Sequence, residues 1–503
     1  MSRIAGIAGQ ADRVRIARML EAMAHRGRYG QHIWTAPAGW GLGCLQRGGD
    51  GGLQPLANED GTLWLAMDGE IHNHRALREE LAGRHTFRTE SDAEVVLHLF
   101  EDYGPACVER LDGPFALAIW GEETGLFLAR DVLGVKPLYW GEDEEGNLLF
   151  ASEIKALVAE VPRVQALPPG HRWRVGGAVE AFDRLPAPPV SVTEAGEAVK
   201  ALDRALNEAV QKRLAGAGPV GCFLSGGLDS SLVAAVARRH IGGDLHTFAV
   251  GMEGSADLEH ARQVAADLGT IHHERVLTEA EVVEAIPRIV DALESCDPAL
   301  VRGAVATYFA SALAAEHVPI VLSGEGADEL FGGYHYLAEF DGADRALSAE
   351  LRALTAALHN TGLQRVDRMA AIQGLEVRMP FLDRSLVELA FRMGPGLKRR
   401  KGEGKWIVRL VAERYLRPGT VWRTKEKFAI GTGIGPTLER YAQRAVPGAV
   451  LARERTPRGL PFASKEEYLY WSFFRRRYGR EDVLALMGRS RSLNPGQRWV
   501  GAL

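Results

Sequence analysis

Residues 220–233 combine the residue types that bind a polyphosphate. The segment reads Val-Gly-Cys-Phe-Leu-Ser-Gly-Gly-Leu-Asp-Ser-Ser-Leu-Val, so a short apolar run ends in a turn of glycines and hydroxyl side chains. Glycines allow backbone N–H groups to close around an anion, and the start of a following helix adds its dipole. Asp229 fits beside an anion only when a cation lies between them. The segment therefore predicts a loop for a polyphosphate with Mg²⁺, built from Ser225, Gly226, Gly227, Asp229 and Ser230.

This loop differs from the common phosphate-binding loops. No lysine follows the glycines, so the Gly-x-x-x-x-Gly-Lys pattern does not apply, and the kinase pattern is absent as well. A plain glycine-rich turn between a strand and a helix is the alternative interpretation of so short a segment. The spacing Ser-Gly-Gly-x-Asp-Ser is similar to the pyrophosphate loop of ATP pyrophosphatases, which cleave ATP between its α and β phosphates.

A second glycine-rich segment, residues 323–334, carries three carboxylates close together. It reads Ser-Gly-Glu-Gly-Ala-Asp-Glu-Leu-Phe-Gly-Gly-Tyr. Carboxylates at this spacing repel one another unless cations neutralise them. Asp328 is therefore predicted to bind Mg²⁺ together with Asp229, provided that both lie at neighbouring strand ends. An acidic cap on a helix N-terminus is the structural alternative.

The elements around these two segments predict a parallel sheet. Apolar runs at 220–224, 244–250 and 318–322 alternate with stretches of helix length, which is typical of a doubly wound α/β fold. Ligands of such sheets bind at the carboxyl ends of the strands. Both glycine-rich segments follow such an end, so we expect them to meet there.

The chain is expected to divide into two domains. Residues 1–183 are rich in short β-type runs and glycines, whereas helices and strands alternate over 201–485. Residues 184–200 begin with a proline-rich stretch that predicts a linker. The last fifty residues are basic and are predicted to be irregular, with 486–503 as a tail.

Several strands and a helix of the first domain can be predicted from the local sequence. Leu63–Met67 predicts a strand, and residues 115–120 with 125–130 predict a hairpin of buried strands. A helix is expected after Ser91, with Ser91 as its cap and Glu94 completing a capping box.

Composition is that of an ordinary globular protein. The 503 residues are 46% hydrophobic and 25% charged, and the net charge of −5 gives no reason to expect nucleic acid as a partner. Four widely separated cysteines predict neither a zinc site nor disulfides, so a cytoplasmic location is expected. No apolar run approaches the roughly 20 residues of a membrane helix, and the N-terminus lacks a signal-peptide core, so no membrane association is expected.

Over nearly its whole length the chain resembles glutamine-dependent asparagine synthetase. Residues 225–231 and 323–334 match the two ATP motifs of that family. Other matches, in chain order, are His25-Arg26-Gly27, Gly69–Ile71, Ser91–Glu94, Leu128–Asp131, Gly134–Tyr139, Gly269–Glu274, Glu376–Asp383 and Arg423–Phe428. The resemblance implies an α/β protein with an N-terminal αββα glutaminase-like sandwich and a C-terminal ATP-pyrophosphatase domain with a doubly wound parallel sheet.

The resemblance also implies a mechanism that uses ATP and Mg²⁺. A substrate carboxylate attacks the α-phosphorus of ATP, pyrophosphate leaves, and an amine converts the acyl-adenylate into an amide. Lys425 matches a lysine that stabilises charge on the phosphates and during acyl transfer, and Glu325 matches the group that accepts a proton from the amine. The remaining matched positions are Asp229 and Asp328 for metal, Leu224, Val250, Gly324 and Glu325 for ATP, and Asp367, Glu376 and Arg378 near the acyl pocket.

The glutaminase half departs from the family at its chemical centre. The family uses an N-terminal cysteine as nucleophile, and here that position is Ser2, or Ala5 if the second Ala-Gly copy is aligned. A hydroxyl is a much poorer nucleophile than a thiol at neutral pH. Cys44 stands where an arginine grips glutamine, and Asp68 replaces an asparagine that stabilises the oxyanion. The glutaminase half is therefore expected to be inactive.

These departures favour an amide synthetase that takes ammonia or another amine and a small-molecule carboxylate. Relatives without the cysteine include β-lactam synthetase, in which a tyrosine replaces the residue found here as Glu325, so the glutamate favours intermolecular amidation over ring closure. Ordinary asparagine synthesis from aspartate and ammonia, β-lactam-type cyclisation, hydrolysis by Ser2 and a catalytically silent binding protein stay open as alternatives. The identity of the carboxylate is not determined, and the resemblance allows a homodimer.

Overall fold

The computed structural model describes residues 2–24, 29–36, 39–47, 52–216, 218–338, 344–400, 402–425, 428–457, 459 and 461–489. Three predicted segments lie outside these ranges in whole or in part. They are the His25-Arg26-Gly27 motif, Glu426 and Lys427 of the Arg423–Phe428 motif, and residues 490–503 of the expected tail. The chain divides into two compact units, of which unit 1 is Met1–Leu185 with Arg477–Met487 and unit 2 is Pro186–Arg476 with Gly488–Leu503.

Unit 1 includes a segment from the far end of the chain. The sequence analysis assigns residues 477–485 to the second domain, whereas the structure groups Arg477–Met487 with unit 1. Here Arg480 donates hydrogen bonds to the carbonyl oxygens of Val158 and Val161, each at 2.7 Å. Such long-range contacts leave no signal in the local sequence.

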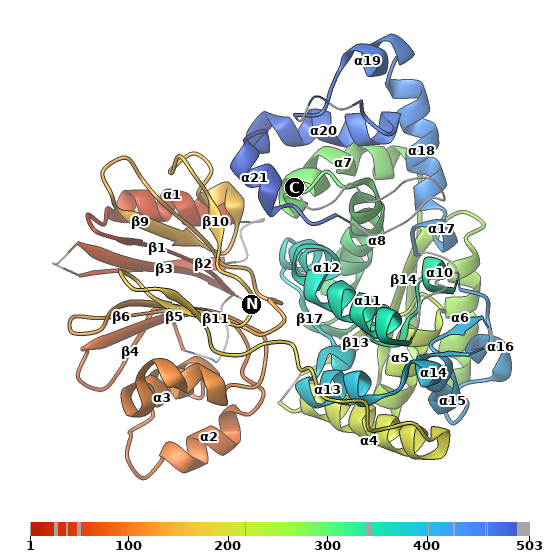
Figure 1. Ribbon diagram of the computed structural model, residues 1–503, viewed down its shortest axis with the longest axis horizontal. Coiled ribbons are helices and arrows are strands. Elements are labelled where there is room, and N and C mark those ends of the chain that lie inside the picture. The colour runs from red at the N-terminus through yellow and green to blue at the C-terminus, as the bar shows by residue number, and fades with distance from the viewer. Residues whose placement is uncertain are drawn as a thin grey trace. The chain divides into compact units, whose positions relative to one another are not determined.

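Unit 1 is a sandwich of two antiparallel sheets with helices outside (Figure 1). Its strands are β1 Ser2–Ala8, β2 Tyr29–Ala36, β3 Trp40–Arg47, β4 Leu56–Ala57, β5 Leu63–Gly69, β6 Phe115–Gly121, β7 Gly125–Arg130, β8 Tyr139–Glu142, β9 Leu148–Ala151, β10 Gln165–Ala166, β11 His171–Arg174 and β12 Val179–Ala181. Its helices are α1 Arg13–Met23, α2 His74–Leu81, α3 Asp92–Tyr103, the 3₁₀ turns Gly104–Arg110 and Ile154–Ala156, and α21 Glu481–Leu486. The sheets have the orders β10-β8-β9-β1-β3-β2 and β12-β11-β7-β6-β5-β4.

The predicted αββα architecture is confirmed. Helix α1 packs on β1 and β3 of one sheet, and α3 packs on β5 of the other. Strands β6 and β7 pair antiparallel as the predicted hairpin, and β5 extends the predicted strand as far as Gly69.

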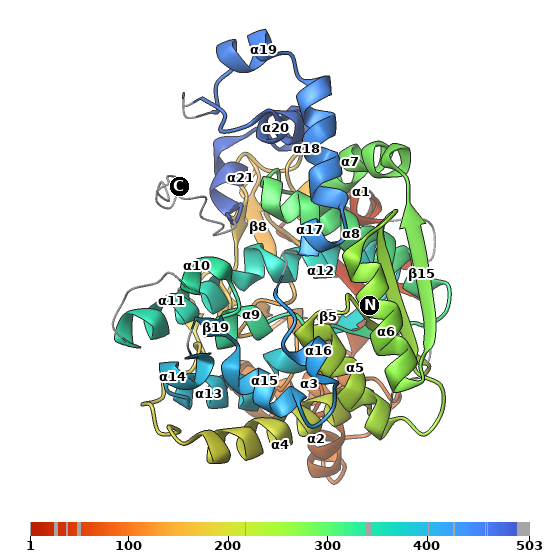
Figure 2. The ribbon, with the colours of Figure 1, turned by 90° about the vertical axis from the view of Figure 1, so that its right-hand side faces the viewer.

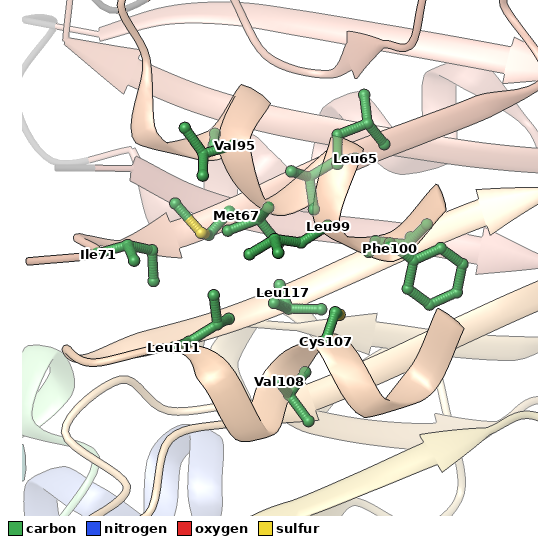
Figure 3. Close-up of a cluster of buried hydrophobic side chains, with 14 of the residues drawn as sticks. Leu65, Met67, Ile71, Val95, Leu99, Phe100, Cys107, Val108, Leu111 and Leu117 are labelled. Carbon is green, nitrogen blue, oxygen red and sulfur yellow. The ribbon is translucent and has the colours of Figure 1, made fainter. Parts of the chain in front are cut away.

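The alternation of side chains along β5 explains how this strand contacts a helix on one face and the second sheet on the other. Leu65 and Met67 face the helical side, where they pack with Val95 and Leu99 of α3 (Figure 3). Ala66, between them, belongs to the cluster that joins the two sheets. Because successive strand residues point to opposite faces, a strand covered on both sides reads as a continuous apolar run.

Helix α3 begins as predicted with Ser91 as its N-cap, but the predicted capping box with Glu94 does not form. The Ser91 hydroxyl accepts the N–H of Ala93 at 3.2 Å. Glu94 accepts the N–H groups of Arg88 and Thr89, because the preceding loop folds back over the first helical turn.

Unit 2 contains the predicted doubly wound parallel sheet, in the order β15-β14-β13-β16-β17. Figure 2 shows the edge strand β15 beside α6. Its strands are β13 Val220–Phe223, β14 His246–Met252, β15 Ile271–Leu277, β16 Ile320–Leu322, β17 Glu376–Arg378, β18 Arg399–Arg400 and β19 Glu403–Gly404. The helices from α4 to α12 are α4 Ala195–Leu214, α5 Leu228–His240, α6 Ala256–Leu268, α7 Glu279–Leu293, α8 Pro298–Ala315, α9 Ala327–Phe331, α10 His335–Ala338, α11 Asp344–Ala356 and α12 Gly362–Ala371. The helices that follow are α13 Arg384–Arg392, α14 Pro395–Lys398, α15 Trp406–Ala412, α16 Pro418–Val421, α17 Phe428–Gly431, α18 Ile434–Ala445, α19 Gly448–Arg453 and α20 Lys465–Tyr478, with short 3₁₀ turns at Ala357–Asn360 and Pro380–Leu382.

The basic C-terminal region is helical over much of its length, so the predicted irregular structure is wrong for α20 and α21. Tyr470, Phe474 and Tyr478 are buried, which gives α20 an apolar side despite its run of arginines. Their spacing of four residues places them on one face of a helix.

Helix α8 is long and apolar enough to cross a membrane, a feature that the sequence analysis did not single out. In the structure 61% of it is buried, and it packs against α7, α12 and β14. This burial is the pattern of a core helix. No other helix in the described ranges meets the same criteria.

Candidate active site

The predicted phosphate loop lies between the end of β13 and the start of α5. Gly226 has φ +67°, and a Cβ there would lie only 2.5 Å from the Cβ of His260, so the turn requires glycine. The Ser225 N–H donates to the Ser230 hydroxyl at 3.2 Å, and the two hydroxyl oxygens are 3.0 Å apart. Leu224 is held to β14 by a hydrogen bond from its N–H to the Phe248 carbonyl at 2.8 Å.

The two predicted metal-binding aspartates lie together at the carboxyl ends of neighbouring strands. A Cβ on Gly324 would lie 2.9 Å from the Asp229 side chain, so the two glycine-rich loops are packed directly against each other. One side chain bridges both carboxylates: the Lys405 Nζ is 2.6 Å from Asp328 Oδ1 and also forms an ion pair with Asp229. Lys425 forms a further ion pair with Asp328.

Lys405 is the functional residue that the sequence analysis missed. It follows β19 in the segment Gly-Glu-Gly-Lys-Trp, far along the chain from both aspartates, and no spacing links it to them. Its φ of 56° is in the left-handed region, which is uncommon for a non-glycine residue. That backbone places the buried ammonium between the two carboxylates.

Burial and opposite charge compete at this cluster, and charge prevails at Asp328 and Lys405 but not at Lys425. Burial alone raises the pKa of Asp328, but Lys405 and Lys425 outweigh it and hold that pKa well below the usual range. Burial likewise lowers the pKa of Lys405, but Asp229 and Asp328 raise it above its ordinary value. For Lys425, burial prevails over Asp328 and the pKa is lowered.

One carboxylate oxygen in the cluster has an unused coordination position. Asp229 Oδ1 is buried and has no hydrogen-bond partner among the described residues. A buried, unpaired carboxylate oxygen is costly unless a cation or a water satisfies it. Two adjacent carboxylates with a free oxygen fit the oxygen ligands that Mg²⁺ prefers.

Glu325 is held in place from the opposite side of the loop. The Arg365 guanidinium lies 2.6 Å from its Oε2 and donates a second hydrogen bond to the Thr307 hydroxyl at 2.7 Å. Glu329, one helical turn further on, is buried, and burial together with Glu325 and Asp328 raises its pKa to about 7. The Tyr334 hydroxyl donates to Glu329.

A cavity of about 640 Å³ joins these groups, a size suited to a nucleotide. Of the predicted site residues, it is lined by Leu224, Ser225, Asp229, Ser230, Val250, Gly324, Glu325, Asp328 and Lys425. Other polar or aromatic lining residues are Phe248, Arg302, Thr307, Tyr334, Tyr336 and Arg365. Gly226 and Gly227 shape the turn and do not line the cavity.

The three residues expected near the acyl pocket lie elsewhere. Asp367, Glu376 and Arg378 are not among the residues that line the cavity. The Arg378 guanidinium pairs with Glu376 at 2.6 Å and donates to a carbonyl oxygen of α4. A motif's place along the chain does not determine the direction of its side chains, and the cavity instead presents Arg302 and Arg365.

In unit 1, a buried ion-pair network occupies the position expected for glutaminase chemistry. Arg3, next to Ser2 on β1, pairs with Asp68 at 2.7 Å and with Glu153 at 2.9 Å. Glu153 also pairs with Lys155 at 2.7 Å, and all four side chains are buried. The sequence analysis named Asp68 and overlooked its partner Arg3. The available signal was a positive charge near the start of an otherwise apolar strand.

No thiolate replaces the missing nucleophile. The four cysteines of the chain are free and buried. Burial raises the pKa of each thiol to about 12. Cys44, the one adjacent to Ser2, is therefore protonated at neutral pH.

The αββα sandwich and the parallel sheet with its cavity match the two domains of an ATP-dependent amide ligase of the asparagine synthetase type. The glutamine amidotransferase domain model matches residues 1–169, and the asparagine synthase model matches residues 201–348 and 338–483. The chain belongs to the asparagine synthetase family.

Full-length relatives support this membership. A probable asparagine synthetase of Dictyostelium discoideum is 35% identical over 492 residues, covering 90% of this chain and 86% of the relative. Asparagine synthetase B of Escherichia coli is 38% identical over 451 residues, covering 84% and 80%. Both are described as glutamine-hydrolysing. A solved allosteric regulatory enzyme of purine biosynthesis matches 50% of this chain and 66% of its own at 21% identity, with a TM-score of 0.33, too low to support an inference.

Proposed function

We propose that this protein adenylates a small-molecule carboxylate with ATP and transfers the acyl group to ammonia or another free amine, without hydrolysing glutamine. The observation that carries the proposal is the contrast between the two units. The cavity of unit 2 retains the matched ATP-site groups, whereas Arg3 and Asp68 form a buried ion pair in unit 1.

In the first step, the ATP-site residues position the nucleotide for attack. Leu224 and Val250 supply apolar contacts for adenine, and the loop before α5 supplies N–H and hydroxyl donors for the phosphates. The substrate carboxylate oxygen forms a bond to the α-phosphorus, and the bond to the bridging oxygen breaks. Pyrophosphate leaves with that electron pair, and the acyl-adenylate forms. Lys405 and Lys425 place positive charge where negative charge increases on the phosphates.

Asp229 and Asp328 are the residues that we propose to hold Mg²⁺. Their adjacency and the unpaired Asp229 oxygen support this assignment. The ion would neutralise charge on the triphosphate and on the departing pyrophosphate.

In the second step, an amine nitrogen attacks the acyl carbon. The carbon–oxygen bond to AMP breaks, AMP leaves with the electron pair, and the nitrogen loses a proton. Glu325 lies in the cavity and is oriented by Arg365, so we assign it as the acceptor of that proton.

The nitrogen donor is the point at which this protein departs from its named relatives. Glutaminase chemistry needs a nucleophile and donors for an oxyanion, but Ser2 offers a hydroxyl and Asp68 a negative charge. The ion pair with Arg3 holds that charge in place. Asparagine formation from aspartate and ammonia is the second candidate, favoured by the names of the relatives and by Glu325.

A donor comparison tests the proposal. Carboxylates are screened with ATP and Mg²⁺ for release of pyrophosphate and AMP, with ammonium, other amines or glutamine as donor. We expect amide formation with ammonium or an amine, and no glutamate release from glutamine. Asp229→Asn and Lys425→Ala are expected to abolish pyrophosphate release, and Ser2→Cys is expected to gain no glutaminase activity because Arg3 and Asp68 remain.

Two outcomes would overturn parts of the proposal. Hydrolysis of glutamine that Ser2→Ala abolishes would show an active glutaminase. Failure to bind ATP or to exchange pyrophosphate with any acid would favour a silent binding protein.

A reducing cytoplasmic location is proposed as well, since all four cysteines are free.

A further inference from the structure

A compact group of two histidines and two glutamates lies in unit 1, outside the ion-pair network described above. One ligand atom from each of Glu59, His85, His98 and Glu101 lies within 4.8 Å of the other three. Glu59 follows β4, His85 follows α2, and the other two residues belong to α3, where a spacing of three places them on one face. Figure 1 shows α2 and α3 side by side below the sheet that contains β4.

The separations between the nitrogen and oxygen atoms suit a small tetrahedral ion. His85 Nδ1 is 3.6 Å from Glu59 Oε1 and 3.6 Å from Glu101 Oε2, and His98 Nδ1 is 3.4 Å from Glu59 Oε2. Zinc bonds of about 2.0–2.1 Å in a tetrahedron give ligand separations of about 3.4 Å. The fourth distance, 2.6 Å between His98 Nδ1 and Glu101 Oε2, is a hydrogen bond, so an ion that binds Nδ1 would displace its proton and leave the ring protonated at Nε2.

Several polar atoms of the group also form hydrogen bonds with residues outside it. His85 Nε2 lies 3.1 Å from Asp102 Oδ1, so this nitrogen carries the proton and leaves the Nδ1 lone pair facing the glutamates. Glu101 Oε1 accepts a hydrogen bond from the Asn58 amide at 2.8 Å. Glu59 Oε1 accepts the Thr86 N–H at 2.9 Å. Ligands oriented by second hydrogen bonds in this way are typical of metal sites.

Burial and charge are consistent with an ion that enters from solvent and then becomes enclosed. The His98 side chain is 1% exposed, whereas that of Glu59 is 33% exposed. Two carboxylates and one divalent cation sum to zero charge, and neutral imidazoles complete the set. Without a cation, the two carboxylates repel each other across a largely buried space.

We infer that Glu59, His85, His98 and Glu101 form a binding site for a divalent transition-metal ion, with Zn²⁺ as the best match. Two imidazole nitrogens and two carboxylate oxygens in a tetrahedral arrangement suit Zn²⁺ better than Mg²⁺, which requires octahedral oxygen ligands. Because the protein supplies four ligands, the site is structural. It joins the loop after β4, the loop after α2 and helix α3.

The test uses the full chain, freed of metal with a chelator and then titrated with ZnCl₂. Metal retained after gel filtration is measured by mass spectrometry, and Co²⁺ in place of Zn²⁺ reports tetrahedral geometry through its visible absorption. We expect one equivalent to be retained, with a higher melting temperature. Glu101→Gln and His85→Ala are expected to lose this equivalent, and Asp102→Asn is expected to weaken it by about 10- to 100-fold.

Two controls separate this site from other candidates. His240→Ala removes an exposed histidine of unit 2 and is expected to retain the metal, and Asp229→Asn tests whether the ATP cavity holds it instead. Circular dichroism confirms that each variant is folded, and Glu101→Gln preserves size if His85→Ala does not fold. No metal bound by the wild-type protein, or unchanged retention in both ligand variants, would overturn the inference.

Discussion

At the residue scale, Lys405 shows how one side chain can hold two catalytic loops together. Its ammonium lies between Asp229 and Asp328, which come from different strand ends. Two half-buried carboxylates would otherwise repel each other. The lysine therefore holds the two loops together, and under the proposed function it also adds positive charge near the bound triphosphate.

The first prediction concerns Lys405→Met. We expect pyrophosphate release to fall by about 100-fold or more, the usual loss for a removed transition-state charge. We also expect a loss of about 1–3 kcal/mol in unfolding free energy, because Asp229 loses its ion-pair partner whereas Asp328 keeps Lys425. Mg²⁺ should raise the melting temperature of the variant more than that of the wild type.

Lys398→Met is a matched control for this prediction. Lys398 is buried away from the cavity, and burial lowers its pKa to about 7. Its removal at pH 8 is therefore expected to leave pyrophosphate release unchanged. Equal losses in both variants would assign the effect of Lys405 to general packing.

A second prediction concerns pH and Glu329, whose folded-state pKa of about 7 lies above its ordinary value of 4.5. Between these values the folded protein holds a proton that the unfolded chain releases, so stability from this group falls as pH rises from about 4.5 to 7. Glu329→Gln removes the titration. We expect the difference in unfolding midpoint, wild type minus variant, to decrease as the pH rises over this range. A difference that stays constant or increases with pH would contradict the assignment of the pKa to Glu329.

At the element scale, the turn between β13 and α5 determines how closely the two loops approach. Gly226 has a positive φ, and its position leaves no space for a Cβ beside His260. The Arg423 guanidinium donates to the Gly226 carbonyl at 3.2 Å and pairs with Asp257 at 2.8 Å, which ties the turn to the segment that carries Lys425. The loop is thus positioned by packing on three sides.

The third prediction is that Gly226→Ala weakens ATP binding. Alanine at this φ costs about 1–3 kcal/mol in backbone strain, and the contact with His260 adds to it. We expect ATP affinity, measured by calorimetry, to fall about tenfold or more. Gly242→Ala is the control, because a Cβ there meets no atom within 4 Å. Unchanged affinity in Gly226→Ala would show that the turn can relax.

At the scale of the whole molecule, the two units differ in what their family-matched motifs do. In unit 2 the two glycine-rich motifs line a cavity, whereas in unit 1 the motif around Asp131 contributes to internal structure. Asp131 accepts the N–H groups of Leu133, Val135 and Lys136, and Arg130 donates to three carbonyl oxygens.

The fourth prediction separates the two units. Asp68→Ala removes the ion pair with Arg3 and leaves the one between Arg3 and Glu153, and we expect a loss of about 3 kcal/mol in unfolding free energy. Ammonium-dependent pyrophosphate release per folded molecule is expected to remain unchanged, because the chemistry lies in unit 2. Glu122→Ala, at an exposed position of the same unit, should change neither quantity. Loss of activity in Asp68→Ala without unfolding would show that unit 1 contributes to the reaction.

Sequence alone predicted both fold classes and most of the residues that line the cavity from the proposed ATP site. Alternation of apolar runs and helices, together with glycine-rich turns at strand ends, was enough to place Asp229 and Asp328 together, because parallel strands end at the same edge of a sheet. The tertiary structure decided what depends on side-chain direction and on distant partners. It placed Lys405 between the aspartates, turned Glu376 and Arg378 toward each other and away from the cavity, and paired Arg3 with Asp68. Charged residues that are far apart in the sequence come into contact only when the chain is folded, and local spacing does not predict that contact.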